Sequence, residues 1–551
     1  MLSNNPSKPS KPSNISLGNL FLSKEAEAQQ FLALNSSSLA ELLTFIDFAE
    51  NLAIAFVEVN FPPDANALIE ALQHHPQCQD IQFVVFDFSQ QPELRFLRDE
   101  LVQRLATMPR DENKKLMLVV RGLERAIGIS GNDPPVLQDL NFIRDAYKTS
   151  VPHPMLFILP DYAVTRLAKF APDFWAWRSG VFQFQTTPKT RDDALKFLEP
   201  KMVDRRYDKP VSPERIETLE RLLMEYQPSG QAIASDDLGT CGDILHQLGV
   251  AYLSRNNPRK AGEYLFEALK LAEQQEDLLL QARVKSDLGE AYLRQKEYER
   301  AIAYVQQALK IQEQLSDPHG KAESLKIQGE AYGFLERYEE ALVSYDQSIH
   351  LNPDNHDAWY FRGIMLCNLG HYEEAIASLD QSIHRNRYDP YAWHYRGIAL
   401  YDLGRYEEAI ASYEQSIHRN PGSYYTWIFR GDALCDLGRY EEAITSYDQS
   451  IHLNPDDRYT WSKRGNALLY LERYEEAIVS YQKSLEITRQ IGDCRAEAVL
   501  LFILGVTSLV VDRKQEAIQL FQNARQLFQE LGSEKDVKNC ENAIASLEPS
   551  N

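Results

Sequence analysis

The sequence predicts an α-solenoid of helical hairpins, preceded by an α/β domain with a doubly wound, mainly parallel sheet. Two observations support this prediction. From Trp359 to Tyr474 the chain repeats every 34 residues, which is typical of a solenoid whose hairpins bury their apolar faces only against their neighbours. From about Leu20 to Pro200, short apolar runs alternate with helical segments, which favours a sheet with helices on both faces.

Three different kinds of position keep the 34-residue period: a tryptophan, an Arg-Gly pair and the run Tyr-Glu-Glu-Ala. Because chemically different positions share one period, the repeat belongs to the structure and not to the composition alone. The repeated residues are Trp359, Trp393, Trp427 and Trp461; Gly363, Gly397, Gly431 and Gly465 of the Arg-Gly pairs; and Tyr338, Tyr372, Tyr406, Tyr440 and Tyr474.

The unit from Tyr424 to Asp457 shows the role of each position. Small Gly431 lies among bulky residues at helical spacing, so the second helix of the hairpin can approach the first closely. Gly438 ends the first helix, since a residue that tolerates positive φ is favoured there. Asn454-Pro455 ends the second helix. One unit departs, because Arg387 stands where the other units have proline, and this difference can change one angle between units locally.

The flanking units keep the same pattern with a 40-residue step. Gly249, Gly289 and Gly329 are each 40 residues apart, and so are Gly465 and Gly505. This gives about eight units between Asp243 and Glu548. The polar segment from Glu530 to Lys538 is typical of a solubilising cap on the last unit.

At these residues the chain resembles the tetratricopeptide repeat (TPR) family, for which a 34-residue period is characteristic. The resemblance implies a right-handed superhelix in which helix A of each unit lines a concave groove that binds polypeptides. We therefore expect an arm over residues 1–19, the α/β domain over 20–200, a helical linker over 201–240 and the TPR solenoid over 241–551.

Charge and composition limit the partners. The net charge is −22, and the residues after Pro200 contain 39 Lys and Arg against 56 Asp and Glu. An acidic solenoid repels phosphate backbones, so a basic or neutral protein or peptide is the expected partner and nucleic acid is not. The six cysteines form no CxxC pair, and we expect no metal and no cofactor.

The start of the chain contains no apolar signal core, and no apolar run reaches the length of a membrane span. We expect a cytoplasmic protein. The first twenty residues, rich in Ser, Pro, Asn and Lys, are interpreted as a disordered arm.

Five apolar runs in the amino-terminal third predict buried strands, and four segments between them predict helices. The strands are Leu52–Val59, Ile81–Phe88, Leu116–Val120, Met155–Leu159 and Val181–Phe184; the helices are Ala65–Gln73, Pro92–Ala106, Val136–Tyr147 and Tyr162–Phe170.

A sheet of this kind often binds a nucleotide at the first strand-to-helix turn. Here the turn from Asn60 to Asn66 contains no glycine, and no lysine occurs between Lys24 and Lys114, so the phosphate-binding loop is missing. Leu116–Glu124 and His153–Asp161 nevertheless resemble strands of STAND-type signalling NTPases, as does Trp175–Gly180 for a later turn. The resemblance implies a degenerate, non-hydrolysing P-loop-like domain kept for binding or self-association.

Three weaker candidates have simpler explanations. Glu124 could polarise a water, but a surface glutamate is the preferred interpretation without a metal partner. Arg178 could contact a phosphate, but packing on the neighbouring tryptophans is preferred. The histidines that keep the 34-residue period are better explained by the helix dipole than by a metal. They are His350, His384, His418 and His452.

The resemblance places the second, fifth, ninth, twelfth and thirteenth residues of helix A in the groove. The resulting candidates are Tyr391, His394, Tyr401, Asp402, Tyr425, Asp432, Asp436, Tyr459, Asn466 and Tyr470. Such a groove is rich in tyrosine and acid, so it would attract Lys or Arg and would repel an acidic C-terminus. The alternative is that these tyrosines only pack between helices.

Three functions remain in order of preference. The first is an interaction scaffold that holds a polypeptide in the TPR groove. The second is a nucleotide-responsive, STAND-like regulator that uses the amino-terminal domain. The third, a hydrolase or transferase, comes last because the α/β portion contains no Gly-x-Ser-x-Gly elbow, and we expect no enzyme.

Overall fold

A computed structural model describes residues 28–128, 134–198, 210–226 and 233–547. The arm expected at 1–19 lies outside the described residues, and so do parts of the expected linker. The chain forms two compact units, residues 1–280 and 281–551, which are described separately below. Among the described residues, no single helix is long and apolar enough to cross a membrane; the segments Ala28–Leu34 and Ser36–Phe48 meet that criterion only together, across an 86° bend.

The amino-terminal unit contains a five-stranded parallel sheet in the order β2-β3-β4-β1-β5. All five predicted strands are present, each within a few residues of the expected bounds. They are β1 (Ile54–Glu58), β2 (Ile81–Asp87), β3 (Lys115–Arg121), β4 (Met155–Leu159) and β5 (Arg178–Gln183).

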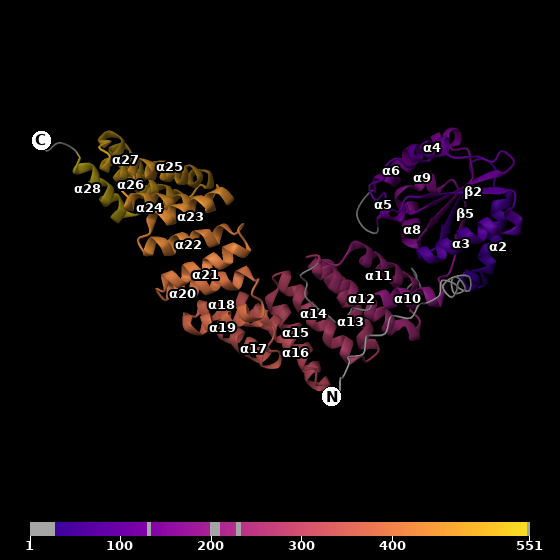
Figure 1. Ribbon diagram of the computed structural model, residues 1–551, viewed down its shortest axis with the longest axis horizontal. Helices are drawn as coiled ribbons and strands as arrows, with labels where there is room; N and C mark the ends of the chain where they lie inside the picture. Colours follow the sequence, from indigo (N-terminus) through magenta and orange to yellow (C-terminus); the bar gives the residue numbers. More distant parts are fainter. Residues whose placement is uncertain (1–27, 129–133, 199–209, 227–232, 548–551) are drawn as a thin grey trace, which may run out of the picture. The chain divides into compact units, whose positions relative to one another are not determined.

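The two faces of this sheet are buried in separate cores, because alternate residues of each strand point to opposite sides. Phe56, Leu118 and Phe157 belong to one core, and Val57 and Ile158 belong to the other. Helices cover both faces, with α4, α6 and α8 on one side and α2 and α3 on the other (Figure 1). The expected doubly wound α/β architecture is therefore present.

All four predicted helices of this unit are found, although one of them is broken. The segment predicted from Val136 to Tyr147 forms two helices that meet near Ile143. The sequence pattern also missed α2, α5, α9 and α10. The helices are α2 (Ser36–Phe48), α3 (Pro62–His74), α4 (Leu97–Thr107), α5 (Glu124–Ile127), α6 (Pro135–Phe142), α7 (Arg144–Ser150), α8 (Asp161–Phe170), α9 (Pro172–Trp175), α10 (Pro188–Leu198) and α11 (Pro213–Tyr226).

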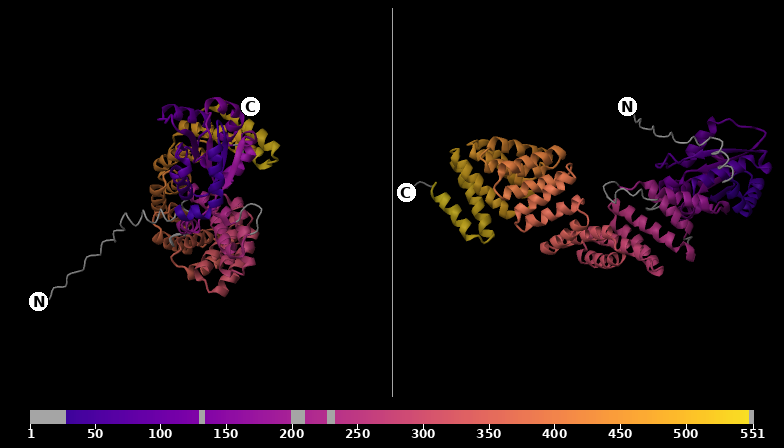
Figure 2. Two further views of the ribbon diagram at one scale, coloured as in Figure 1. Left: turned by 90° about the vertical axis from the view of Figure 1, so that its right-hand side faces the viewer. Right: turned by 60° about the horizontal axis from the view of Figure 1, so that its bottom comes forward.

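Eight consecutive helical hairpins follow α11 in the described part of the chain, and a last helix, α28, packs on the eighth (Figure 2). The first hairpin lies in the amino-terminal unit and the third to eighth lie in the carboxy-terminal unit. The hairpins are α12–α13 (Leu238–Ser254, Pro258–Gln274), α14–α15 (Leu278–Arg294, Tyr298–Leu315), α16–α17 (Pro318–Phe334, Tyr338–Leu351), α18–α19 (His356–Asn368, Tyr372–Arg385), α20–α21 (Pro390–Asp402, Tyr406–Arg419), α22–α23 (Tyr424–Asp436, Tyr440–Leu453), α24–α25 (Arg458–Tyr470, Tyr474–Ile491) and α26–α27 (Cys494–Val510, Lys514–Glu530), with α28 at Glu534–Ala545.

The repeated glycine makes the same contact in every hairpin. A Cβ built on Gly431 would lie 2.5 Å from the ring of Tyr447 in the second helix of its hairpin. The corresponding separation is 2.4 Å at Gly397 and 2.6 Å at Gly363 and Gly465. Only glycine allows the two helices to pack this closely, as the sequence pattern predicts.

The boundaries of the helices also follow the prediction. Gly438 has φ +73° directly after α22. Each repeated tryptophan donates its indole N–H to the backbone carbonyl six residues earlier, and Trp427 bonds Pro421 at 3.2 Å. In the unit without this proline, Trp393 bonds the carbonyl of Arg387 at 3.4 Å. Because only the backbone is used, Arg387 keeps the contact.

Candidate functional site

The first helices of successive hairpins contact one another directly in the carboxy-terminal unit. α18 packs on α20, α20 on α22 and α22 on α24, in addition to the contacts within each hairpin. First helices that meet across whole hairpins lie on the inner side of a curved array. We call the surface formed by α18, α20, α22, α24 and α26 the first-helix face.

Three tyrosines at the same place in successive units are exposed on this face. Tyr391, Tyr425 and Tyr459 follow the N-caps of α20, α22 and α24 and are 57–61% exposed. Tyr470, at the end of α24, is 69% exposed, and its ring stacks on Tyr440 at 4.8 Å. These four candidates therefore present aromatic surface to solvent.

The acidic candidates differ in whether they have a cationic partner. Asp432 is bound by the Lys463 ammonium at 2.9 Å and accepts a hydrogen bond from Tyr447 at 2.8 Å, so its charge is compensated. Asp436 accepts only the Tyr401 hydroxyl, at 2.5 Å. Exposed Asp402 forms no ion pair with any described residue. Two acids in adjacent units thus remain without a cation.

Two further candidates are part of the packing between helices. The imidazole of His394 lies against Tyr413 and Phe429, with ring centroids 5.8 and 5.3 Å away, and Thr426 Oγ1 is 3.2 Å from its Nδ1. Burial lowers the pKa of His394 to about 4, so the ring is neutral at physiological pH. Asn466 accepts a hydrogen bond from the buried Tyr481 at 2.6 Å.

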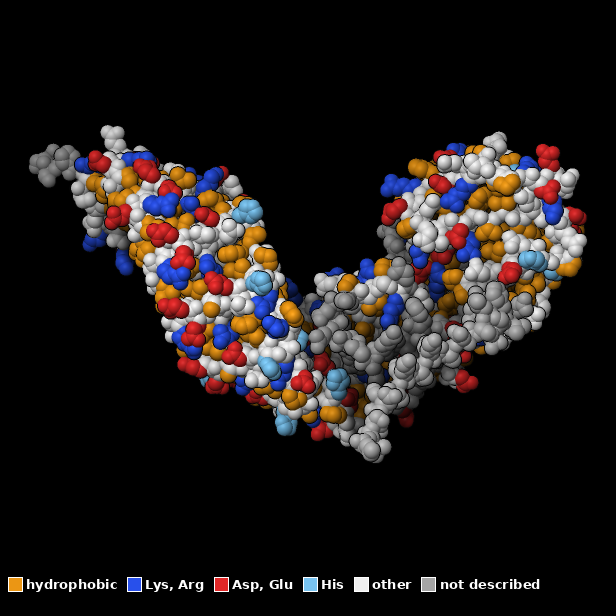
Figure 3. Space-filling view, in the orientation of Figure 1, with side chains coloured by type: hydrophobic (Ala, Val, Ile, Leu, Met, Phe, Trp, Pro, Cys, Tyr) orange, Lys and Arg blue, Asp and Glu red, His pale blue; other side chains and the backbone are white. Residues whose placement is uncertain are grey.

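The sequence analysis missed an apolar part of the first-helix face on α26. Val499, Val506, Leu509 and Val510 are exposed there, at the unit positions that carry tyrosine, aspartate or asparagine in the preceding units. The same position rule would have found them, but the last unit was interpreted only as a cap. Figure 3 shows hydrophobic side chains among charged ones over the visible surface of this unit.

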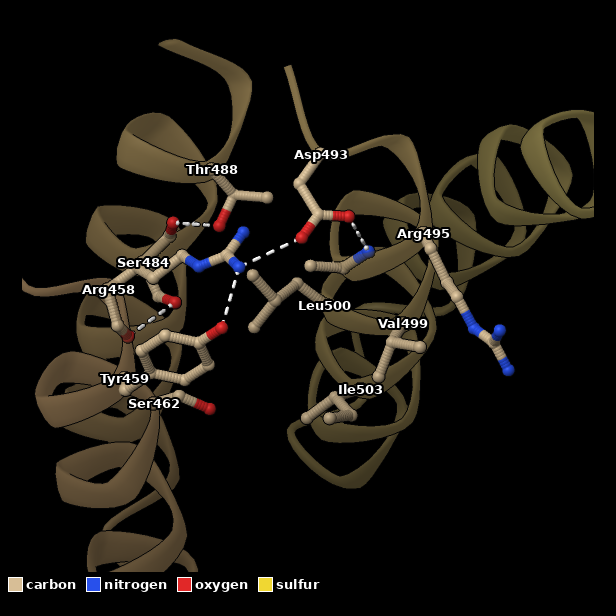
Figure 4. Close-up of a pocket in the computed structure, with 11 residues that line it drawn as sticks. Arg458, Tyr459, Ser462, Ser484, Thr488, Asp493, Arg495, Val499, Leu500 and Ile503 are labelled. Carbon is tan, nitrogen blue, oxygen red and sulfur yellow. Dashed lines mark hydrogen bonds and ion pairs between the residues drawn. The ribbon is translucent and has the colours of Figure 1, made fainter. Parts of the chain in front are cut away.

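A pocket of about 330 Å³ lies between α24 and α26. Tyr459 and Ser462 line one wall, and Val499, Leu500 and Ile503 line the other (Figure 4). At its mouth Arg458 binds Asp493 at 2.8 Å and also donates to the Tyr459 hydroxyl at 2.7 Å. The walls are largely apolar, so the pocket suits an aliphatic side chain.

In the amino-terminal unit, α11 covers the carboxyl ends of the strands. Glu225 accepts hydrogen bonds from Asn60 at 2.5 Å and from Thr186 at 2.6 Å, after β1 and β5 respectively. Arg221 donates to the Asn60 carbonyl at 3.1 Å and pairs with Glu124 at 3.4 Å and with Glu217. Ligands of parallel α/β sheets usually bind at this edge, which here is occupied by the chain itself.

Two weaker candidates are resolved by these contacts. The interpretation of Glu124 as a surface residue is wrong, because its side chain is 14% exposed and pairs with Arg221. Arg178 stacks over the ring of Trp175 at 4.4 Å, which confirms the packing interpretation. In the part of the chain that the structure describes, no three His, Cys, Asp or Glu side chains are grouped so that they could hold a metal ion.

Comparison with known families agrees with the hairpin geometry. Models of the tetratricopeptide repeat match residues 244–279, 280–352, 328–390, 366–424, 431–472 and 456–530. The array consists of tetratricopeptide repeats. In the TPR array the repeated glycines thus keep the contact between the two helices of each unit. No comparison bears on the resemblance of the amino-terminal domain to STAND-type NTPases, which stays a prediction.

Solved TPR structures are similar over part of the chain. The C-terminal part of a TPR repeat-containing protein from Cytophaga hutchinsonii is 16% identical with a TM-score of 0.40, covering 46% of this chain and 98% of that one. A TPR protein from Parabacteroides merdae is 20% identical with a TM-score of 0.34, covering 45% and 93%. YrrB, described as a TPR protein with an unusual peptide-binding site, is 18% identical with a TM-score of 0.28, covering 30% and 86%. No curated protein matches the chain significantly.

Proposed function

We propose that this protein is an interaction scaffold whose first-helix face binds a polypeptide. The observation that supports the proposal is the row of exposed tyrosines, Tyr391, Tyr425 and Tyr459, on adjacent first helices. Large aromatic side chains supply most of the binding energy in many interfaces, because they bury much area and lose little conformational entropy. A row of them with the period of the array offers a regular binding surface.

The charges on the face define the chemistry of the partner. Asp402 and Asp436 have no cationic partner among the described residues, so they favour a bound Lys or Arg and disfavour a carboxylate. The apolar surface of α26 and the adjacent pocket suit aliphatic side chains. The proposed partner is therefore a basic or neutral polypeptide, and the proposed function is binding without catalysis.

The alternative, a nucleotide-responsive regulator, depends on the parallel sheet of the amino-terminal unit. Its carboxyl edge is covered by α11 through Arg221 and Glu225, which weighs against a bound nucleotide. Calorimetric titration of the full chain with ATP and magnesium tests this alternative. Saturable heat would favour it, and a titration without heat would leave the scaffold as the preferred function.

The scaffold proposal is tested by selecting peptides on the full chain from a random library. Selected peptides should bind the wild-type chain and lose most of their affinity for the variant with Tyr391, Tyr425 and Tyr459 all changed to Ala. Tyr388→Ala is the matched control, because Tyr388 is 76% exposed but precedes α20 and lies outside the first-helix face. Equal loss of binding in both variants would contradict the proposal.

A further inference from the structure

The first-helix face carries two rows of side chains with the same period. Tyr391, Tyr425 and Tyr459 form one row near the beginning of the helices, and Asp402 and Asp436 form the other at their end. The second and thirteenth residues of a helix are about 16 Å apart along its axis, at 1.5 Å per residue. A strip of this width separates the rows.

Each step along either row equals the distance between adjacent first helices. Those helices pack directly on one another, and packed helices lie about 8–10 Å apart. A polyproline II helix rises 3.1 Å per residue and has three residues per turn, so it advances about 9.3 Å per turn. A ligand in this conformation, laid across the helices, presents the same side to each successive unit.

One segment of this chain has that three-residue period. Residues 6–12, which lie outside the described residues, read Pro-Ser-Lys-Pro-Ser-Lys-Pro. Pro6, Pro9 and Pro12 fall on one side of a polyproline II helix, and Lys8 and Lys11 fall on another. The first 24 residues contain three lysines and no acid, in a chain whose net charge is −22. The segment is therefore complementary in charge to the acidic array.

We propose that residues 6–12 dock on the first-helix face as a polyproline II helix, with one Pro-Ser-Lys step per repeat. The three prolines stack on Tyr391, Tyr425 and Tyr459, as prolines do in the aromatic grooves of proline-recognition domains. The two lysines extend to Asp402 and Asp436, the two acids of the face without a cation. Asp432 is not available, because Lys463 already binds it.

This inference rests on the proposed function, because it assigns a ligand to the same face. Docking of the segment would place it in competition with other polypeptides. Such competition reduces the apparent affinity of any partner in proportion to the docked fraction. The segment comes from the same copy or from a second copy of the chain, and the test below distinguishes the two.

The test uses the full chain with a photo-crosslinking p-benzoylphenylalanine in place of Tyr425. After irradiation and digestion, an adduct between position 425 and the fragment of residues 1–24 is expected, since trypsin does not cleave Lys-Pro bonds. The variant with Pro6, Pro9 and Pro12 changed to Ala should reduce the yield about tenfold. The crosslinker at Tyr388, off the face, should give no such adduct. Mixing ¹⁵N-labelled and unlabelled chains gives hybrid adducts for docking between copies and none for docking within one copy.

Two results overturn the inference and separate it from the proposed function. An adduct yield unchanged by the proline substitutions would show that the three-residue period is not recognised. If position 425 captures an added, library-selected peptide but never residues 1–24, the inference fails and the scaffold function stands. If it captures neither, both fail.

Discussion

The Tyr401 hydroxyl donates a hydrogen bond to Asp436 Oδ2 at 2.5 Å and so joins the inner helices of two successive repeats. The bond fixes the acid at the edge of the first-helix face while leaving it without a cation. A double-mutant cycle with Tyr401→Phe and Asp436→Asn should give a coupling of about 1 kcal/mol in urea unfolding. Additive effects of the two substitutions would show that the bond does not contribute.

The same two residues test partner binding. Tyr401→Ala combined with Asp436→Ala should weaken the capture of a basic peptide without unfolding the array, because both residues lie at the surface of the inner helices. Peptide affinity and circular dichroism are measured on the same samples. Unchanged affinity in a folded variant would contradict a role for these residues.

The close contact between helices predicts a specific cost at the repeated glycine. Gly431→Ala should destabilise the carboxy-terminal unit by about 1–3 kcal/mol, because the new Cβ would lie 2.5 Å from the ring of Tyr447. Gly422→Ala is the control, since its nearest neighbour would be the Asn420 side chain at 3.5 Å. Thermal unfolding compares the two, and an equal effect at both positions would contradict the assigned role.

Two buried tyrosines in equivalent positions differ in their hydroxyl contacts. Tyr481 donates to Asn466, whereas the Tyr413 hydroxyl has no partner among the described residues, and the residue equivalent to Asn466 in its unit is Ile398. Tyr481→Phe should cost about 1 kcal/mol and Tyr413→Phe should be nearly neutral or stabilising. Urea unfolding of the two variants measures the difference, and the reverse order would be inconsistent with these contacts.

The low pKa of His394 predicts a pH dependence. Burial holds this pKa at about 4 in the folded chain, below its ordinary value of 6.5, so protons bind more readily to the unfolded chain. Stability from this residue is complete above pH 6.5 and is lost as the pH falls toward 4. His394→Phe, which keeps an aromatic ring against Tyr413 and Phe429, should remove about 2 kcal/mol of that loss. Identical pH profiles for variant and wild type would refute this.

Most of the fold could be predicted because the patterns are local. The 34-residue period fixes the hairpins, and the apolar runs fix the five strands. The helices α2 and α10 were missed because neither has a strong apolar stripe bounded by turn residues. The role of the arginine in the repeated Arg-Gly pair was also missed. Arg430 bonds Glu414 of the preceding hairpin at 2.8 Å and Ser446 of its own at 2.7 Å, a contact between residues 16 positions apart.

The candidate site was predictable only by position. The position rule placed Tyr391, Tyr425 and Tyr459 on the exposed face, where the structure has them. It could not tell that His394 is packed among aromatic rings or that Lys463 compensates Asp432, because both depend on side chains from the next unit. Likewise, the ion pair of Glu124 with Arg221 depends on α11, which folds back on the sheet from almost 100 residues later.

The most direct test of the proposed binding face is ¹⁹F NMR of the full chain with fluorotyrosine at position 425 or, in a second sample, at position 388. A library-selected basic peptide is titrated into each sample. A saturable shift of the resonance at position 425, with none at position 388, is the predicted result. A peptide that binds with full affinity and leaves the resonance at position 425 unchanged would contradict binding at the first-helix face.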